Sequence, residues 1–506
     1  MVAKSLSEIS RRGVLAGGLA GLVGSVFIEE AKATGVTFSH ILGRPTPASI
    51  ALNLMASAAA SVYVEYGYSK TSFTIKTVAQ SVSSQTPTVF EIGGLKSNSK
   101  VYYRLRYKEG SASSYSAGTT LSFSTAKSAG KSFQFTLQGD THPERAGKMF
   151  NADLYVVTQK NIVSQSPDFH ILLGDDFSID PLIGKNQATQ ANIEKIYSTH
   201  RNWLAISGGT VPIFLVNGNH EQAAQYLLDG TNSNPAVLAG NARLKYFPLP
   251  ISNSFYSADK TQVEFVGNPR DYYSWTWGDA TFITLDPYWH SKLPVDNVAG
   301  VSSDQATTGG TKKGGSGSTP SPTPGTGSGK TKDLWQVGLG DDQYFWFKNI
   351  LETSKSKYIF VFTHHVMGTG RGAVEVSYNY EFGGNDPTKT TTFAAQRPGW
   401  ALPIHDLMVK HGVSIFFQGH DHIYCTQSRD GIVYQSVPNP ADDTFTMFNS
   451  DAYTSGVKAP NSGHIRVTVG STSAKVEYFL AARPTDTARK NLSLAHSYTV
   501  KPRSVR

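Results

Sequence analysis

With 506 residues the chain exceeds the roughly 250–300 residues at which single hydrophobic cores stop growing, so more than one domain is expected. Hydrophobic residues make up 39% of it and fall in many short apolar runs, which indicates a globular, strand-rich protein. The formal net charge of +8 comes from dispersed basic residues without a basic stripe, which argues against nucleic acid as a dedicated partner. Cys425 is the only cysteine, which excludes an internal disulfide and a thiolate metal cage.

The N-terminal segment has the pattern of an export signal. Arg11 and Arg12 precede an uncharged stretch, residues 13–27, and a small-x-small cleavage pattern ends at Ala33. The uncharged stretch is shorter than the roughly 20 residues that span a bilayer as a helix. The segment resembles a Tat-type signal, so residues 1–33 are expected to direct export by the Tat machinery to the periplasm or outside the cell. No membrane span is expected after removal of the signal.

Residues 34–127 alternate between apolar and polar positions, broken by Gly, Ser and Pro turns. This period of two predicts an antiparallel β-sandwich of about 90 residues. The segment "GLKSNSKVYYRLRY" resembles the turn and strand of a fibronectin type III domain, in the version that precedes the catalytic domain of purple acid phosphatases and their relatives. The residues expected on inner faces are Ile50, Leu52 and Leu54 in one strand, and Val101, Tyr103, Leu105 and Tyr107 in another.

Residues 131–482 follow a different pattern, in which apolar strands alternate with helical or loop stretches, so an α/β layered domain is expected. Within it, residues 302–332 are expected to form a disordered insertion, because the part from 309 onward has no apolar or acidic residue and cannot bury a core. The strands "GHIRVTVGS" and "AKVEYFLAA" are expected to finish the second sheet. Residues 483–506 are set apart as a C-terminal extension.

One helix is predicted with some detail, over "DDQYFWFKNILETSKS". Asp341 or Asp342 is expected near its N-cap. Its buried side is expected to include Phe345, Ile350 and Leu351.

Five polar clusters share one design, in which an apolar strand is followed by a turn that carries metal-type ligands. Because open α/β sheets place ligand sites at the carboxyl ends of their strands, five such ends can converge in one cleft. Asp, Asn and His donors suit Zn, Mn or Fe better than a thiolate site or an all-oxygen Ca site. The clusters are "QGDTHPE" with Asp140 and His142, "LLGDDFS" with Asp175 and Asp176, "NGNHE" with Asn219, His220 and Glu221, "FTHHVM" with His364 and His365, and "QGHDH" with His420 and His422.

In this order the clusters resemble the calcineurin-like metallophosphoesterase signature: D-x-H, G-D, G-N-H-[ED], H and G-H-x-H. The resemblance covers most of residues 133–480 and implies a four-layer α-β-β-α domain that holds two divalent or trivalent transition-metal ions, Fe, Mn or Zn. It also implies the ligands: Asp140, His142 and His422 for one ion, Asn219, His364 and His420 for the other, and Asp175 as the bridge and a catalytic residue. His220 would be the catalytic acid that protonates the leaving group.

The chemistry of such a centre is consistent with ester hydrolysis. Two cations about 3.5–4 Å apart clamp a phosphoryl group while a shared water loses its proton, and the hydroxide attacks phosphorus in line. An imidazole can protonate a departing alkoxide near neutral pH. The sequence therefore favours an exported phosphoesterase that hydrolyses small-molecule phosphomonoesters or phosphodiesters.

Several neighbouring residues have secondary roles in this interpretation. His364 is favoured over His365, because the family places the ligand at the first His and a neighbour on a strand points to the opposite face. Asp176 is expected to support or cap the ligand turn, and Glu221 to orient a neighbouring ligand. Ser178 stands where purple acid phosphatases carry a Tyr that gives their colour, so the purple chromophore is not expected.

Two arginines are candidates for binding substrate, since a guanidinium fork suits phosphate oxygens. Arg145 follows the first motif closely, and Arg371 follows the fourth in a Gly-rich loop. An exposed, solvated arginine is an equal alternative for each.

Two other functions stay open. One is a phosphodiesterase or nucleotidase specialised for nucleotides or lipid headgroups, because a single sequence does not report the groove that a diester needs. The other is a catalytically inactive surface-binding module. Inactive relatives usually lose one or more ligands, whereas all seven ligand positions are filled here, which argues against this alternative.

Overall fold

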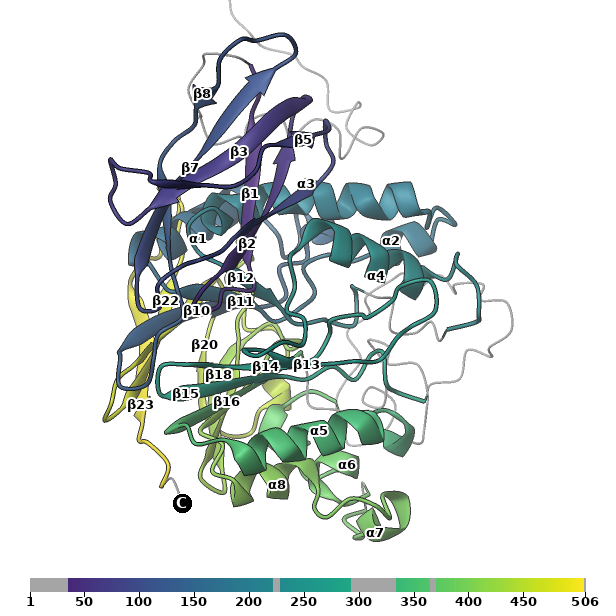
Figure 1. Cartoon of the computed structure of the whole chain (residues 1–506). Helices are drawn as coiled ribbons and strands as arrows, with labels where there is room; N and C mark the ends of the chain where they lie inside the picture. Colours follow the sequence, from purple (N-terminus) through teal and green to yellow (C-terminus); the bar gives the residue numbers. More distant parts are fainter. Residues whose placement is uncertain (1–34, 222–227, 293–333, 365–369, 387, 505–506) are drawn as a thin grey trace, which may run out of the picture.

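The computed structural model describes residues 35–221, 228–292, 334–364, 370–386 and 388–504. In Figure 1 a smaller β region lies at one end of a larger region of sheets and helices. The expected signal, residues 1–33, and the expected insertion, residues 302–332, lie outside the described residues. Among the helices that are described, none combines the length and the apolar character needed to cross a membrane.

The smaller region consists of two antiparallel sheets around one core. One sheet has the order β1-β2-β6, and the other has the order β4-β3-β7-β8 with β5 paired to β3 and β9 paired to β7. All seven residues predicted to face inward, from Ile50 to Tyr107, are buried in this core, which confirms a β domain. The strands are β1 Phe38–Gly43, β2 Ile50–Ala56, β3 Ala60–Gly67, β4 Ile75–Lys76, β5 Gln80–Val82, β6 Thr88–Ile92, β7 Lys100–Glu109, β8 Ser116–Ala117 and β9 Leu121–Ser124.

Two larger sheets form the centre of the molecule. The first has the order β12-β11-β10-β21-β22-β23, and the second has the order β13-β14-β15-β16-β17-β19-β18-β20. In the first sheet β11 pairs parallel with both β10 and β12. In the second sheet the parallel strands are, in order, β15, β16, β17 and β19. The strands are β10 Phe133–Gln138, β11 Phe169–Leu172, β12 Ile213–Leu215, β13 Ser257–Ala258, β14 Tyr273–Trp277, β15 Ala280–Thr284, β16 Tyr358–Thr363, β17 Ile415–Gln418, β18 Tyr424–Arg429, β19 Ile432–Ser436, β20 Val457–Ala459, β21 Gly463–Val469, β22 Ala474–Leu480 and β23 Leu494–Val500.

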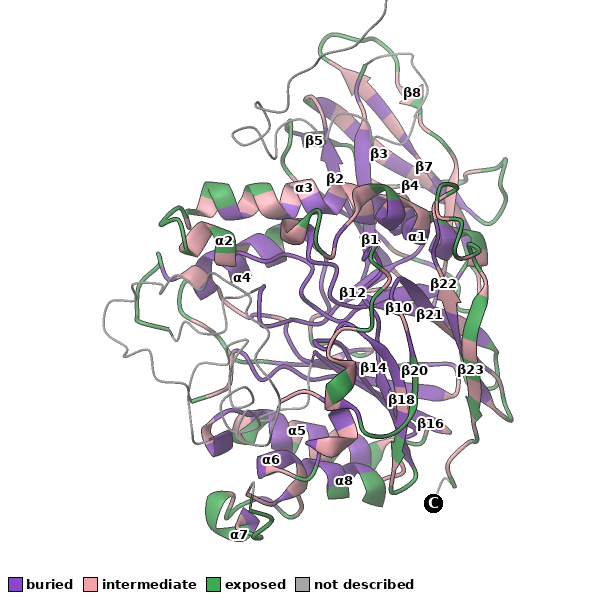
Figure 2. Cartoon of the chain, turned by 180° about the vertical axis from the view of Figure 1, so that it is seen from behind, coloured by how far each residue is buried: buried purple, intermediate pink, exposed green. Residues whose placement is uncertain are grey.

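Helices cover the outer face of each sheet, which gives four layers (Figures 1 and 2). Side chains of α1, α3 and α4 share a core with β11 and β12, whereas α5, α6 and α8 share a core with β15, β16 and β17. Asn151 caps α1, and Thr189 caps α3, each by accepting a backbone hydrogen bond from the first turn. The helices are α1 Ala152–Gln165, α2 Asp180–Ile183, α3 Gln190–Gly208, α4 Pro235–Tyr246, α5 Gly340–Thr353, α6 Tyr380–Gly383, α7 Phe393–Gln396 and α8 Ile404–Lys410.

The central strands are largely apolar because both of their faces are buried. In β16, Phe360 and Phe362 face the core between the two sheets. Ile359 and Val361 face the core beneath α5. Since successive side chains of a strand point to opposite faces, a strand covered on both sides is a continuous apolar run.

The last strands differ from the prediction. β21 and β22 do not finish the second sheet, because β21 pairs antiparallel with β10 of the first sheet, and β22 pairs with β21. β23 pairs with β22 in turn, so the sheet continues into residues 483–506, the segment that the sequence sets apart as an extension. The chain thus returns to cover the open edge of β10 with hydrogen bonds.

The predicted helix forms as α5, and its buried side differs from the prediction at Phe345. Leu351 is buried as expected and Ile350 packs partly against the core, whereas Phe345 is 47% exposed. Gln343 is buried instead, because its side chain accepts from Asp286 N at 2.8 Å and donates to Asp286 O at 2.6 Å. The helix begins at Gly340 with Leu339 at the N-cap, which places the two predicted capping aspartates in the first turn.

A buried arginine joins the β region to α3. Arg201, on α3, is fully buried, and its guanidinium donates to Ser39 Oγ and Ser39 O at 3.0 Å, to Asn53 O at 2.5 Å and to Tyr246 O at 2.6 Å. Burial lowers the pKa of Arg201 to about 9. Ser39 and Asn53 belong to β1 and β2, so this side chain joins the β region to α3 through hydrogen bonds.

The substitution Arg201→Met should lower the free energy of unfolding by at least about 2 kcal/mol, because a buried acceptor left without its donor costs about 1–3 kcal/mol. Urea denaturation of the full chain measures this loss. Arg104→Met is the control, since Arg104 pairs with Glu65 in a partly exposed ion pair that should contribute below about 1 kcal/mol. An equal loss in both variants would contradict the prediction.

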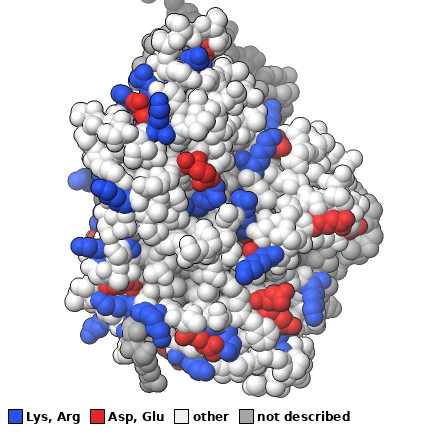
Figure 3. All heavy atoms as spheres, in the orientation of Figure 1, with Lys and Arg blue, Asp and Glu red and all other residues white. Residues whose placement is uncertain are grey.

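Charged side chains are scattered over the face shown in Figure 3, where basic and acidic groups are interspersed. Several basic residues are paired, among them Lys245 with Glu194 at 2.6 Å and Arg466 with Glu477 at 2.7 Å. On this face the positive charge does not gather into a single stripe.

Candidate metal centre

The five polar clusters lie at the carboxyl ends of five parallel strands. β10, β11 and β12 end just before the first three clusters, and β16 and β17 end just before the last two. Because the strands within each sheet are parallel there, their carboxyl ends meet at one edge, and the two sheets bring both edges together. The residues that follow these strand ends are Asp140, Asp175, Asn219, His364 and His420.

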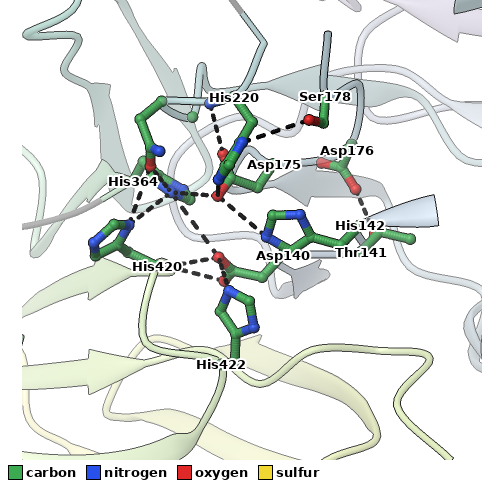
Figure 4. A network of polar contacts seen from close by, with 12 residues as sticks. Asp140, Thr141, His142, Asp175, Asp176, Ser178, His220, His364, His420 and His422 are labelled. Carbon is green, nitrogen blue, oxygen red and sulfur yellow. Dashed lines mark hydrogen bonds and ion pairs between the residues drawn. The ribbon is translucent and has the colours of Figure 1, made fainter. Parts of the chain in front are cut away.

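The side chains form two ligand groups that share Asp175 (Figure 4). In each group the possible ligand atoms lie within 4.8 Å of one another. One group contains Asp140, His142, Asp175 and His422, and the other contains Asp175, His364 and His420. The structure therefore brings together the residues that the sequence predicted for each ion, with Asp175 between them.

The second group is compact and includes Asn219. His364 Nε2 lies 3.1 Å from Asp175 Oδ2 and 3.1 Å from Asn219 Oδ1. His420 Nδ1 lies 3.1 Å from the same Asn219 oxygen. Ligand atoms bound to one ion at about 2.0–2.2 Å lie roughly 3–3.5 Å apart, so these spacings fit a cation.

The first group has similar spacings and a buried nitrogen without a hydrogen bond. His142 Nε2 lies 3.3 Å from Asp175 Oδ2, and His422 Nε2 lies 3.4 Å from Asp140 Oδ1. His142 Nε2 is buried and makes no hydrogen bond of normal geometry within the described part of the chain. Such a nitrogen, beside the Asp175 carboxylate, fits a metal ligand.

Left-handed backbone conformations turn these side chains toward one centre. Five of the predicted ligand residues have positive φ: Asp140 at 59°, His142 at 47°, Asp175 at 61°, His420 at 69° and His422 at 51°. Each such residue costs of order 1–3 kcal/mol and persists only where its surroundings enforce it. The turns that carry the ligands therefore hold a part of the backbone strain of this chain.

The glycine of the third cluster is required by close packing. A methyl group at Gly218 would lie 2.2 Å from Asp175 Oδ1 and 2.4 Å from Asp175 N. Glu221 accepts from Gly218 N and from Asp176 N, each at 2.5 Å, and so holds the second and third turns together. Asp176 accepts from Thr141 Oγ1 at 2.5 Å, which joins the first turn to the second. Glu221 and Asp176 thus support the turns through hydrogen bonds.

Two histidines have their outward nitrogens fixed by acceptors. His142 Nδ1 donates to Glu144 Oε1 at 2.7 Å, and His364 Nδ1 donates to Leu173 O at 2.7 Å. Each bond leaves Nε2 directed at the centre, which is the usual arrangement of a metal-binding imidazole. Both oxygens of Asp140 accept from His420 N, at 2.8 and 2.9 Å.

Buried carboxylates and imidazoles perturb one another strongly in this cluster. Burial alone would lower the pKa of His364, but Asp175 and Asp140 raise it to about 10. Burial likewise acts against the charged form of His142, yet Glu144 and Asp175 raise its pKa to about 9. Burial raises the pKa of Asp140 to about 7, and the Asp175 carboxylate adds to this shift. Positive charge beside these carboxylates is therefore stabilising, and either a protonated imidazole or a bound cation can supply it.

His220 and Arg145 lie beside the ligand groups. His220 Nε2 is 3.8 Å from Asp175 Oδ2 and 3.2 Å from Arg145 Nη2. His220 Nδ1 hydrogen bonds to Asp180 Oδ2 at the start of α2. The same nitrogen lies 3.5 Å from Ser178 Oγ, as Figure 4 shows. The Arg145 side chain keeps 32% of its surface exposed, so its guanidinium can reach a bound anion.

The structure describes the candidate substrate residue Arg371 but not His365, the alternative to His364. Arg371 Nη1 donates to His420 O at 2.6 Å and to Asp421 Oδ1 at 3.1 Å, so its guanidinium supports the last ligand turn. His365 lies outside the described residues. The choice of His364 over His365 therefore stays a prediction, although His364 does lie in the cluster.

Sequence reasoning gave no role to two acidic partners, Glu144 and Asp180. Glu144 stands within the first motif, two residues after His142, and this spacing could have indicated it. Asp180 lies five residues after Asp175 with no motif around it, and only the turn into α2 brings it to His220.

Comparison with known proteins agrees with this architecture. The family model of the calcineurin-like phosphoesterases matches residues 133–424. A solved structure of PhoD has 15% sequence identity and a TM-score of 0.59, with 92% of this chain and 90% of that chain covered. A purple acid phosphatase, PPD1, from yellow lupin (Lupinus luteus) seeds has 14% identity and a TM-score of 0.56, with 92% of this chain and 74% of that chain covered.

At these identities the two structures show similarity of fold alone. A search of curated protein sequences found no match. The family match spans more than half of the 506 residues and includes all the turns that carry the ligand groups. The chain therefore belongs to the calcineurin-like phosphoesterase family.

Proposed function

We propose that this protein is an exported hydrolase of small-molecule phosphomonoesters or phosphodiesters that works with two transition-metal ions of the Fe, Mn or Zn type. The observation that carries the proposal is the pair of ligand groups that share Asp175. One carboxylate can give an oxygen to each of two ions, and the other nitrogen and oxygen donors suit these metals. Ions bound there would supply Lewis acidity and activate water for attack on phosphorus.

The chain's own residues supply binding and proton transfer in this proposal. Asp140, His142 and His422 would hold one ion, and Asn219, His364 and His420 the other. His220 would protonate the leaving oxygen through Nε2, because its Nδ1 is held by Asp180. Arg145, which lies 3.2 Å from that Nε2, would bind phosphoryl oxygens beside it.

Two further parts of the proposal rest on sequence patterns. The twin arginines and the cleavage pattern within residues 1–33 support export by the Tat machinery. The turn and strand around residues 94–107 support a fibronectin III-like identity for the β domain, whose two antiparallel sheets are compatible with it.

The test combines metal content with hydrolysis. Protein purified without added metal is analysed for elements, and turnover of a mono-aryl and a bis-aryl phosphate is measured in parallel. We expect about two transition-metal ions in the binuclear centre and turnover of at least one ester, and the ratio of the two rates would give the ester class. A protein that holds no metal, even after addition of Mn, Zn or Fe, and turns over neither ester would overturn the proposal.

Removing the partner of one ligand should weaken metal binding without removing any ligand. Glu144→Gln should lower the affinity of the ion beside His142 by about 10–100-fold, because the neutral amide holds the imidazole less firmly. Titration of the metal-free protein with Mn or Zn measures this change. Glu352→Gln is the control, since Glu352 pairs with Lys348 on the exposed side of α5, away from both ligand groups. Unchanged affinity in Glu144→Gln would contradict the prediction.

A further inference from the structure

A third group of possible ligands lies at the edge strands of the second sheet. Asp259 directly follows β13, Asp271 stands two residues before β14, and His290 lies in the turns that follow β15. The register explains why they meet, because Ala258 pairs with Tyr273 and Tyr273 pairs with Thr284. Three neighbouring strand ends therefore deliver two carboxylates and one imidazole to the same corner.

The geometry of this corner resembles that of a ligand set. One ligand atom from each of the three residues lies within 4.8 Å of the other two. His290 Nε2 is 2.7 Å from Asp271 Oδ2. Asp259 and Asp271 are buried, and the His290 side chain is only 12% exposed. The first oxygen of Asp259 accepts from Thr261 N at 2.8 Å, which fixes the carboxylate in place.

The second oxygens of the two carboxylates give the independent observation. Asp259 Oδ2 and Asp271 Oδ1 are both buried, and neither makes a hydrogen bond of normal geometry within the part of the chain that the structure describes, although the Asp259 side chain interacts with Tyr272 and Asp271. A buried carboxylate oxygen without a donor is costly. The single imidazole can neutralise one carboxylate but not both.

We infer that Asp259, Asp271 and His290 bind a further metal ion, a divalent transition-metal cation such as Zn²⁺ or Mn²⁺. Two carboxylates and one imidazole form a donor set of intermediate hardness, which these cations prefer. Ca²⁺ takes six to eight oxygen ligands, so a set with a nitrogen among three protein ligands disfavours it. This site is separate from the two groups that share Asp175, because no residue belongs to both.

The role of this ion would be to brace a loop behind the catalytic turns. Asp286, four residues before His290, accepts from Asn217 Nδ2 at 2.5 Å, and Asn217 stands two residues before the predicted ligand Asn219. The backbone of Asp286 is held by Gln343 of α5 through two hydrogen bonds. An ion at His290 would fix the same loop from its other end. We therefore assign these residues a positioning role, with no contact to substrate.

The experiment counts and locates ions in the full-length protein. Wild type and the variants Asp259→Asn and His290→Gln are incubated with Zn²⁺ or Mn²⁺, freed of excess metal by gel filtration and analysed for metal content. The matched control is His405→Gln, because His405 is also a buried histidine paired with one aspartate, with Nε2 2.9 Å from Asp430 Oδ2. Among the described residues His405 belongs to none of the possible ligand groups. Anomalous diffraction at the metal edge from wild-type crystals then locates each ion.

We expect three ions in wild type and in His405→Gln, two ions in Asp259→Asn and His290→Gln, and an anomalous peak between Asp259, Asp271 and His290. The inference is overturned if wild type shows no peak at this corner, or if both corner variants keep the wild-type number of ions. The wild-type peak decides the question alone if the variants fail to fold. A wild type that holds an ion only at this corner would instead refute the binuclear proposal.

Discussion

Replacing Asp175 with asparagine should lower kcat/KM for an aryl phosphate by more than about 100-fold, which is the upper end of what loss of an outer partner of a ligand costs. Asp175 is the one residue common to both ligand groups, so its charge serves two ions at once. Asparagine keeps the shape and can still accept from His220 N, which lies 3.1 Å from Asp175 Oδ1. The loss should therefore reflect weaker metal binding rather than a collapsed turn. Elemental analysis should find at least one ion fewer than in wild type.

Asp279→Asn is the control for this experiment. Asp279 accepts from Gly130 N at 2.8 Å and pairs with Lys357 at 2.9 Å, so it is a bonded carboxylate in the same domain but outside both ligand groups. Its activity and metal content should equal those of wild type. Full turnover by the Asp175→Asn or Asp175→Ala variant would remove the basis for a shared bridge.

Replacing His220 with alanine should lower kcat by about 10²–10⁴-fold for a substrate with an alkoxide leaving group, which is the range for loss of a general acid. The loss should be much smaller for a nitrophenyl ester, because a stable phenolate departs without a proton. His220 belongs to neither ligand group, so the metal content should stay at the wild-type value. The comparison of alkyl and nitrophenyl esters thus separates proton transfer from metal binding.

The partner of His220 gives a graded version of the same test. Asp180→Asn removes the carboxylate that holds His220 Nδ1 but leaves the imidazole in place. Its loss of kcat should be smaller than that of His220→Ala, with the same dependence on the leaving group and little change in KM. An equal loss for alkyl and nitrophenyl esters in both variants would show that His220 has a structural role.

The candidate site could be predicted to an unusual extent because its signals are local. Each ligand turn follows a largely apolar strand, as in β16, where Ile359 and Phe360 face different cores. The end of such a run is visible in the sequence, and a His or Asp placed there has to meet other strand ends. The partners Glu144 and Asp180 were not predicted, because a short acidic side chain near a ligand has many possible neighbours until the turns are folded.

The sequence by itself determined the order of strands and turns, the alternating inner faces of the β domain and the residues that meet at the strand ends, because a period of two and the end of an apolar run are properties of neighbouring residues. Only the tertiary structure decided that Gln343 of α5 is buried while Phe345 is exposed. The reason is that the Gln343 side chain hydrogen bonds to the backbone of Asp286, which is distant in the chain. It also decided that β21 returns to β10 and that Asp259, Asp271 and His290 share one corner. These outcomes depend on which distant segments become neighbours, and no local pattern carries that information.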